Sequence, residues 1–128
     1  MQCPCNSSKT YNECCKIAHQ NIQSIATAES LMRSRYSAFA LANINYLQES
    51  HHSKTRPSNR EKKEILIWAK SVQWIKLEII NITKGRYTDL IGTVEFKAFF
   101  MENGKIDIIH ENSSFCKENN HWTYLKAR

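Results

Sequence analysis

Four cysteines lie within the first fifteen residues of the chain. Cys3 and Cys5 flank a proline, and the adjacent Cys14 and Cys15 come after eight intervening residues. Four thiolates are the usual donor set of a closed tetrahedral zinc site. A segment this short has almost no apolar core of its own, so it depends on a metal ion to fold. The spacing therefore predicts a zinc knuckle over residues 1–16.

The remaining residues, 27–128, are predicted to form one main domain after a polar connector, 16–26. The chain has 128 residues, of which 41% are hydrophobic, and this is enough for a single packed core. No stretch approaches the ~20 apolar residues that span a bilayer, and the amino terminus lacks the apolar run of a signal peptide. We therefore expect no membrane insertion and a cytoplasmic protein.

Disulfides and thiol redox chemistry are the alternatives for the cysteines. Adjacent or once-removed cysteines form disulfides only with strain, and a reducing cytoplasm disfavours them. A redox pair usually has two residues between its cysteines, and no pair here has that spacing. Both alternatives are therefore weaker than zinc. Cys116 stands alone in a predicted strand, where we expect it to be a small core residue.

The residues between the cysteines suit supporting roles. Asn6 tolerates the left-handed backbone conformation of a tight turn, and Ser7 can form a hydrogen bond to the backbone there. Lys9 and Lys16 offset the negative charge of four thiolates. None of these four residues is expected to be a ligand.

Three helices are predicted before any strand. Thr27 is predicted to cap a helix over residues 28–42. Asn43 is predicted to cap a short helix that ends before residue 51, and Ser58 to cap a helix over residues 59–70. Ser58 is followed three positions later by Glu61, which is the pattern of a capping box.

From Val72 onward, apolar residues alternate and predict an antiparallel sheet. In the first strand Ile75, Leu77 and Ile79 share one face, and a bulge near Ile79 transfers the pattern to the other face. The second and third strands are predicted at residues 94–100 and 105–117, joined by a tight turn at Asn103-Gly104. A turn at 118–120 leads to a fourth strand at residues 122–125. Helices followed by a curved antiparallel sheet indicate an α+β fold in which the sheet wraps around the helices and encloses a pocket.

Charge gives little support for nucleic-acid binding. The formal net charge of +6 is modest. Basic residues do gather in one stretch, and they are Lys54, Arg56, Arg60, Lys62, Lys63 and Lys70. Neither a stacked aromatic motif nor a recognition helix accompanies them, so sequence-specific nucleic-acid binding is not expected.

The segment CPCNSSKTYNECC resembles the SEC-C motif, best known from the carboxyl terminus of the translocase motor SecA, where it binds zinc and contacts a chaperone and the ribosome. Asn6 and Ser8 replace two glycines common in that motif, and Cys15 takes a ligand position that is histidine in some members. Farther along, AESLMRSRYSAFALANINYL, HHSKTRP, GTVEF, HENSSF and WTY resemble the YchJ family of small bacterial proteins. That resemblance covers nearly the whole chain. It implies a SEC-C motif joined to a nuclear-transport-factor-like cone and implies no particular reaction.

A pocket inside the cone has several candidate residues. They are Arg33, Arg35, Tyr36, Trp74, His110, Glu111, Ser114 and Trp122. Arg33 and Arg35 lie about 200° apart on a helix, so they cannot share one environment. His110 and Glu111 point to opposite faces of a strand, which argues against joint action on one substrate atom.

We expect these residues to be mainly structural. Either Arg33 or Arg35 should pair with Glu111, and Trp68, Trp74, Phe96 and Trp122 should fill the interior. His51 and His52 precede a basic loop and are expected at the surface. Catalysis by a pocket acid or base, of the isomerase or hydro-lyase type, remains an alternative that rests on fold analogy.

Two functions are therefore open. In the first, zinc shapes the knuckle into an adaptor surface for a protein or ribosomal partner. In the second, the cone binds a small molecule or catalyses a reaction. Neither the partner nor the oligomeric state is marked in the sequence.

Overall fold

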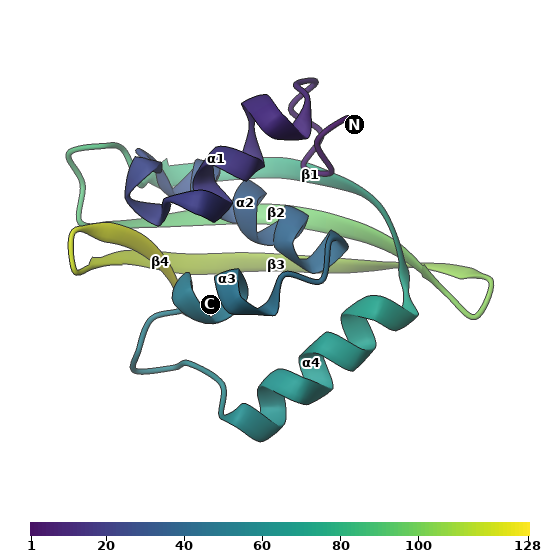
Figure 1. Cartoon of the computed structure of the whole chain (residues 1–128). Coiled ribbons are helices and arrows are strands. Elements are labelled where there is room, and N and C mark those ends of the chain that lie inside the picture. The colour runs from purple at the N-terminus through teal and green to yellow at the C-terminus, as the bar shows by residue number, and fades with distance from the viewer.

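A computed structural model describes residues 1–128 and has a four-stranded antiparallel sheet with helices across one face (Figure 1). The elements are the 3-10 helices η1 (Tyr11–Glu13) and η2 (Ile22–Ser24), the helices α1 (Cys15–Gln20), α2 (Ala28–Ala40), α3 (Ile44–Glu49) and α4 (Asn59–Ser71), and the strands β1 (Gln73–Lys84), β2 (Ile91–Glu102), β3 (Lys105–Glu118) and β4 (His121–Ala127). The predicted α+β class is confirmed. No helix is long and apolar enough to cross a membrane.

The three predicted caps are confirmed. Thr27 accepts a hydrogen bond from the backbone of Ser30, Asn43 accepts one from Tyr46, and Ser58 forms the full capping box with Glu61. α2 ends two residues earlier than predicted, because Ala42 adopts a left-handed φ of 57° that ends the helical path. α2 lies against the concave face of the sheet, where it supplies much of the core.

The strands follow one another in the order β1-β2-β3-β4, each antiparallel to the next. The predicted Asn103-Gly104 turn joins β2 to β3, with φ values of 53° and 78° that suit a tight hairpin. The bend near Ile79 is confirmed by a register shift there. A second shift, between Trp74 and Lys76, turns Ile75 outward and leaves it 43% exposed, so its predicted place beside Leu77 is wrong.

Alternation in β2 builds the floor of the cone. Val94, Phe96, Ala98 and Phe100 are buried, while the residues between them are more exposed. Cys116 on β3, expected in the core, is only partly buried, because it lies on the opposite face of its strand from the buried Phe115.

The segment predicted as a polar connector, 16–26, instead forms α1 and η2. Ala18, Ile22 and Ile25 are each at most 8% exposed and join the main core. With Cys15 they recur at helical spacing, so one face of this segment is apolar despite its polar average. Cys3, Cys5 and Cys15 belong to the same core cluster, which therefore continues from the knuckle into the cone.

Candidate metal centre and cone pocket

The four amino-terminal cysteines converge on one point. Their Sγ atoms all lie within 4.8 Å of one another, with 3.6 Å between Cys5 and Cys14 and 3.9 Å between Cys14 and Cys15. Four sulfurs at the usual zinc distance of about 2.3 Å from a common centre form a tetrahedron with edges of about 3.8 Å. The donor set and its spacing therefore fit a soft divalent ion.

The loop between the cysteine pairs folds back on itself. Cys3 donates its backbone N–H to Lys9 O at 2.9 Å, and Gln2 bridges to Thr10. Asn6 and Ser8 have φ values of 63° and 70°. These are the two positions where the SEC-C motif commonly has glycine, so a left-handed backbone explains that preference. The expected conformation of Asn6 is confirmed.

Hydroxyl groups lie next to two of the sulfurs. Ser7 Oγ is 3.1 Å from Cys14 Sγ and accepts a hydrogen bond from Lys9 N, as predicted for a backbone contact. Ser37 Oγ, on α2, is 3.5 Å from Cys3 Sγ. A hydroxyl that donates to a thiolate sulfur orients that ligand and lowers its negative charge.

The pKa values of the cysteine thiols favour a bound cation. A hydrogen bond from the Cys15 thiol lowers the pKa of Cys5 to about 4. Hydrogen bonding to Cys5 in turn raises the pKa of Cys15, and burial raises that of Cys14. Without a cation Cys5 is therefore the thiolate of this trio while Cys14 and Cys15 keep their protons, and a divalent ion would displace those protons.

Polar contacts fasten the knuckle to the cone. Arg33, on α2, donates from Nη1 to Cys5 O at 2.7 Å and from Nε to Glu29 at 2.9 Å. Asn6 Oδ1 accepts a hydrogen bond from Leu77 N on β1 at 2.8 Å. The candidate pocket residue Arg33 therefore lies at the junction of knuckle and cone, and its ion-pair partner is Glu29 where Glu111 was expected.

His19 on α1 forms a second contact between the knuckle and α2 of the cone, and no pattern in the sequence predicted it. Its Nδ1 is 2.7 Å from Tyr11 Oη, and its Nε2 is 2.8 Å from Ser34 O on α2. Burial lowers the pKa of His19, so the neutral imidazole donates from Nε2 and accepts from the tyrosine hydroxyl. The ring also packs on Tyr46, with centroids 4.5 Å apart.

A cavity of about 240 Å³ lies between α2, α4 and the concave face of the sheet. Four of the candidate pocket residues line it, and they are Arg35, Tyr36, Trp74 and Glu111. The other four candidates lie elsewhere. Trp122 is fully buried in the core, where it donates to Ala26 O at 3.1 Å. His110 pairs with Glu95 on the outer face of the sheet at 2.7 Å, and Ser114 shares that face.

Arg35 and Glu111 both face the cavity and yet make no ion pair. Arg35 is 6% exposed and donates from Nη1 to Leu47 O at 2.9 Å and to Ser50 Oγ at 2.7 Å. Glu111 accepts hydrogen bonds from Ser113 Oγ and, at 3.2 Å, from Tyr124 Oη. The expected pairing of Glu111 with either arginine is therefore wrong, because Leu47 and Ser50 bind Arg35 while Ser113 and Tyr124 bind Glu111.

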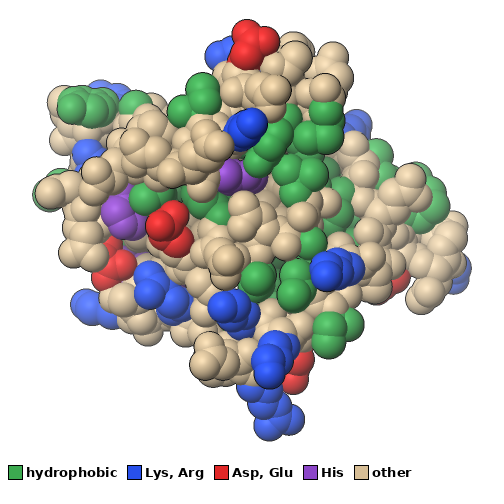
Figure 2. All heavy atoms as spheres, in the orientation of Figure 1, with side chains coloured by type: hydrophobic (Ala, Val, Ile, Leu, Met, Phe, Trp, Pro, Cys, Tyr) green, Lys and Arg blue, Asp and Glu red, His purple; other side chains and the backbone are tan.

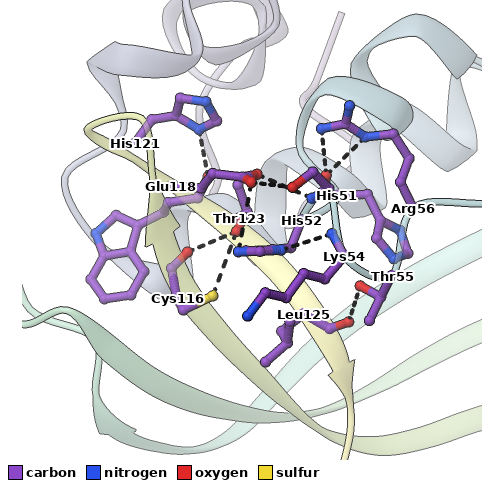
Figure 3. Close-up of polar contacts among 12 residues, drawn as sticks. His51, His52, Lys54, Thr55, Arg56, Cys116, Glu118, His121, Thr123 and Leu125 are labelled. Carbon is purple, nitrogen blue, oxygen red and sulfur yellow. Dashed lines mark hydrogen bonds and ion pairs between the residues drawn. The ribbon is translucent and has the colours of Figure 1, made fainter.

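His51 also lines the cavity, contrary to its expected place at the surface. The segment that follows α3 is held along β4 and the end of β3, as Figure 3 shows: Arg56 donates to His51 O at 3.1 and 2.8 Å, and Thr55 donates to Leu125 O at 2.6 Å. His52 lies 3.7 Å from Glu118. Burial and the nearby Arg35 lower the pKa of His51 to about 4, so its imidazole is neutral at physiological pH.

Comparison with known proteins agrees with this arrangement. A family model described as the YchJ middle NTF2-like domain matches residues 27–127. A UPF0225 protein from Vibrio parahaemolyticus is 38% identical over 123 residues, which are 96% of this chain and 72% of that protein. The solution structure of a SEC-C motif containing protein from Rhodopseudomonas palustris aligns with a TM-score of 0.84 at 30% identity, covering 100% of this chain and 98% of that one.

The crystal structure of a SEC-C motif containing protein from Psychrobacter arcticus aligns with a TM-score of 0.79 at 30% identity, covering 97% of this chain and 80% of that one. Fold and cysteine site together define an NTF2-like cone that carries a SEC-C cysteine motif. The chain belongs to the YchJ family.

Proposed function

We propose that the chain is a zinc-binding protein in which Cys3, Cys5, Cys14 and Cys15 bind one zinc ion that holds the knuckle on the cone. The observation that carries this proposal is the convergence of the four Sγ atoms within 4.8 Å. Sulfur donors favour zinc over hard ions such as magnesium or calcium. The ion would supply the folding free energy that so short a segment lacks.

The zinc ion is structural in this proposal. Four protein ligands complete a tetrahedral shell and leave no position for a water molecule or a substrate. Three of the four cysteines are also at most 5% exposed. A site built from four thiolates requires cysteines that stay reduced, which supports a cytoplasmic location.

The outer surface of the knuckle is our candidate for partner contact. It is polar and exposed, and its exposed residues include Gln2, Asn6, Ser8, Lys9, Thr10, Asn12 and Glu13. The ion would fix this otherwise flexible surface in one shape, which lowers the entropy cost of binding. Together with the resemblance to the SEC-C motif, this supports an adaptor that contacts the ribosome or a protein.

Ribosome co-sedimentation tests the adaptor. A variant with Lys9→Glu and Lys16→Glu is expected to lose most co-sedimentation of the zinc-loaded protein, because reversing charge on a binding face repels phosphate-rich RNA or its bound proteins. The matched control is Lys62→Glu with Lys63→Glu, the same charge change on α4. Absence of wild-type protein from the ribosome pellet would rule out the ribosome as partner, and equal losses in both variants would exclude the knuckle as the contact.

A further inference from the structure

The cone cavity has an apolar end centred on Trp74. The ring centroids of Trp68, Tyr36 and Phe39 lie 5.4, 5.6 and 5.8 Å from that of Trp74. Trp68 comes from α4, and Tyr36 and Phe39 come from α2, so two helices and β1 meet around one indole. Such tilted and edge-on rings form walls suited to a flat aromatic group.

The other end of the cavity is polar and is centred on Tyr124 of β4. The Arg35 guanidinium lies 4.7 Å from the Tyr124 ring centroid, and the His51 ring lies 5.0 Å from it. The Tyr124 hydroxyl donates to Glu111 at 3.2 Å. One cation, one anion and one imidazole thus gather on a single side of an otherwise apolar cavity.

Arg35 makes no direct ion pair within the protein, although Glu111 lies near enough to interact with it electrostatically. It is 94% buried, yet its only hydrogen-bond acceptors are the neutral oxygens of Leu47 and Ser50, and both are bound by Nη1. Nε and Nη2 have no protein partner. Every fully buried side-chain nitrogen in the structure does have one, so Nε and Nη2 must be open to the cavity that Arg35 lines. Nε carries one N–H and Nη2 carries two, and a buried guanidinium with these donors free suits a bidentate carboxylate.

Glu111 has one carboxylate oxygen that accepts no hydrogen bond from the protein. Ser113 and Tyr124 both donate to Oε2, so Oε1 has no protein donor. Because Glu111 lines the cavity, Oε1 is available to a ligand donor there. An ammonium group would neutralise the carboxylate as well as bond to it, which a hydroxyl group would not.

We propose that the cone cavity binds a small aromatic zwitterion: an aromatic ring packed against the cluster formed by Trp68 and Trp74, a carboxylate on Arg35, and an ammonium group on Glu111. Charge balance supports a zwitterion, since Arg35 and Glu111 are the cavity's one cation and one anion. A volume of about 240 Å³ is below the ~300–1,000 Å³ of drug-sized sites, which favours a ligand of amino-acid size.

Basic residues outside the cavity would draw such a ligand in by its carboxylate. Lys and Arg side chains gather over the lower part of the molecule in Figure 2, where α4 lies in Figure 1. Arg56, Arg60 and Lys63 are exposed on α4 and on the segment before it. A positive field over α4, whose Ile65 and Trp68 line the cavity, raises the encounter rate of an anionic group.

Calorimetric titration of the full chain with three probes tests the proposal. The probes are L-phenylalanine, 3-phenylpropionate, which lacks the ammonium group, and 2-phenylethylamine, which lacks the carboxylate. We expect L-phenylalanine to bind at least about tenfold more tightly than either of the others, since each lost charged hydrogen bond leaves a buried partner unsatisfied. Equal affinity for all three probes, or no binding of any at millimolar concentration, would overturn the proposal.

Two conservative substitutions test which residue binds each charged group of the ligand. Glu111→Gln should reduce L-phenylalanine binding to the level of 3-phenylpropionate and leave 3-phenylpropionate unaffected. Arg35→Lys, which keeps the charge but loses the planar fork, should weaken both carboxylates and spare 2-phenylethylamine. The control is His110→Gln, next to Glu111 but on the outer face, which should change nothing. If Glu111→Gln, folded by circular dichroism, kept the preference for the ammonium group, Glu111 would not be its receptor.

Discussion

A variant with Cys14→Ser and Cys15→Ser is expected to lose zinc and to unfold at a temperature about 10 °C or more below the wild type. Two of four ligands would be gone, and a structural zinc site contributes several kcal/mol or more to folding. The loss should spread beyond the knuckle, because Cys15 belongs to the same core cluster as Leu31 and Tyr36 of α2. Thermal unfolding followed by circular dichroism measures it.

Cys116→Ser is the matched control, since Cys116 is a thiol on β3 outside the cluster and is only partly buried. It should shift the free energy of unfolding by no more than about 1 kcal/mol. A double variant that melts within a degree or two of the wild type would show that the cluster does not stabilise the fold.

Trp122→Ala is expected to destabilise the protein by about 3–5 kcal/mol, among the largest effects of any single substitution. Trp122 is 0% exposed, and its indole N–H donates to Ala26 O at 3.1 Å, which ties β4 to the segment before α2. Removing it would leave a cavity and an unpaired carbonyl. Urea unfolding monitored by circular dichroism measures the difference.

The aromatic control for this substitution is Tyr87→Ala, because Tyr87 is 73% exposed in the turn between β1 and β2. It should change the free energy of unfolding by no more than about 0.5 kcal/mol. If Trp122→Ala cost no more than Tyr87→Ala, Trp122 would not hold β4 against the helices.

Local chemistry made much of the fold predictable. Thr27, Asn43 and Ser58 cap their helices as expected, since a side-chain oxygen and a backbone N–H two or three residues on are close in any helix start. The Asn103-Gly104 turn likewise depends on two residues that tolerate a positive φ. Such features need no knowledge of the rest of the chain.

Features that depend on distant contacts were missed. His51 was expected at the surface, but the segment after α3 forms a bridge to Tyr124 of β4, and this brings the imidazole into the cavity. Either Arg33 or Arg35 was expected to pair with Glu111, but Arg33 instead binds Glu29 and the backbone of Cys5. Sequence periodicity gives the face of a helix and not the element that will cover it.

The position of the knuckle was also beyond the sequence pattern. Four cysteines in fifteen residues indicate a metal site whatever surrounds them. Ser37 of α2 approaches Cys3, and Leu77 of β1 donates to Asn6. Both contacts depend on how the knuckle packs on the cone. The zinc ion in our proposal therefore stabilises an interface within the protein as well as the loop that binds it.

The ratio of zinc to protein in freshly purified, reduced, full-length chain tests the account most directly. Elemental mass spectrometry together with quantitative amino-acid analysis should give one zinc atom per chain, falling to near zero in the Cys14→Ser, Cys15→Ser variant. Wild-type protein that carries no stoichiometric metal, and takes up none when zinc is supplied under reducing conditions, would contradict it.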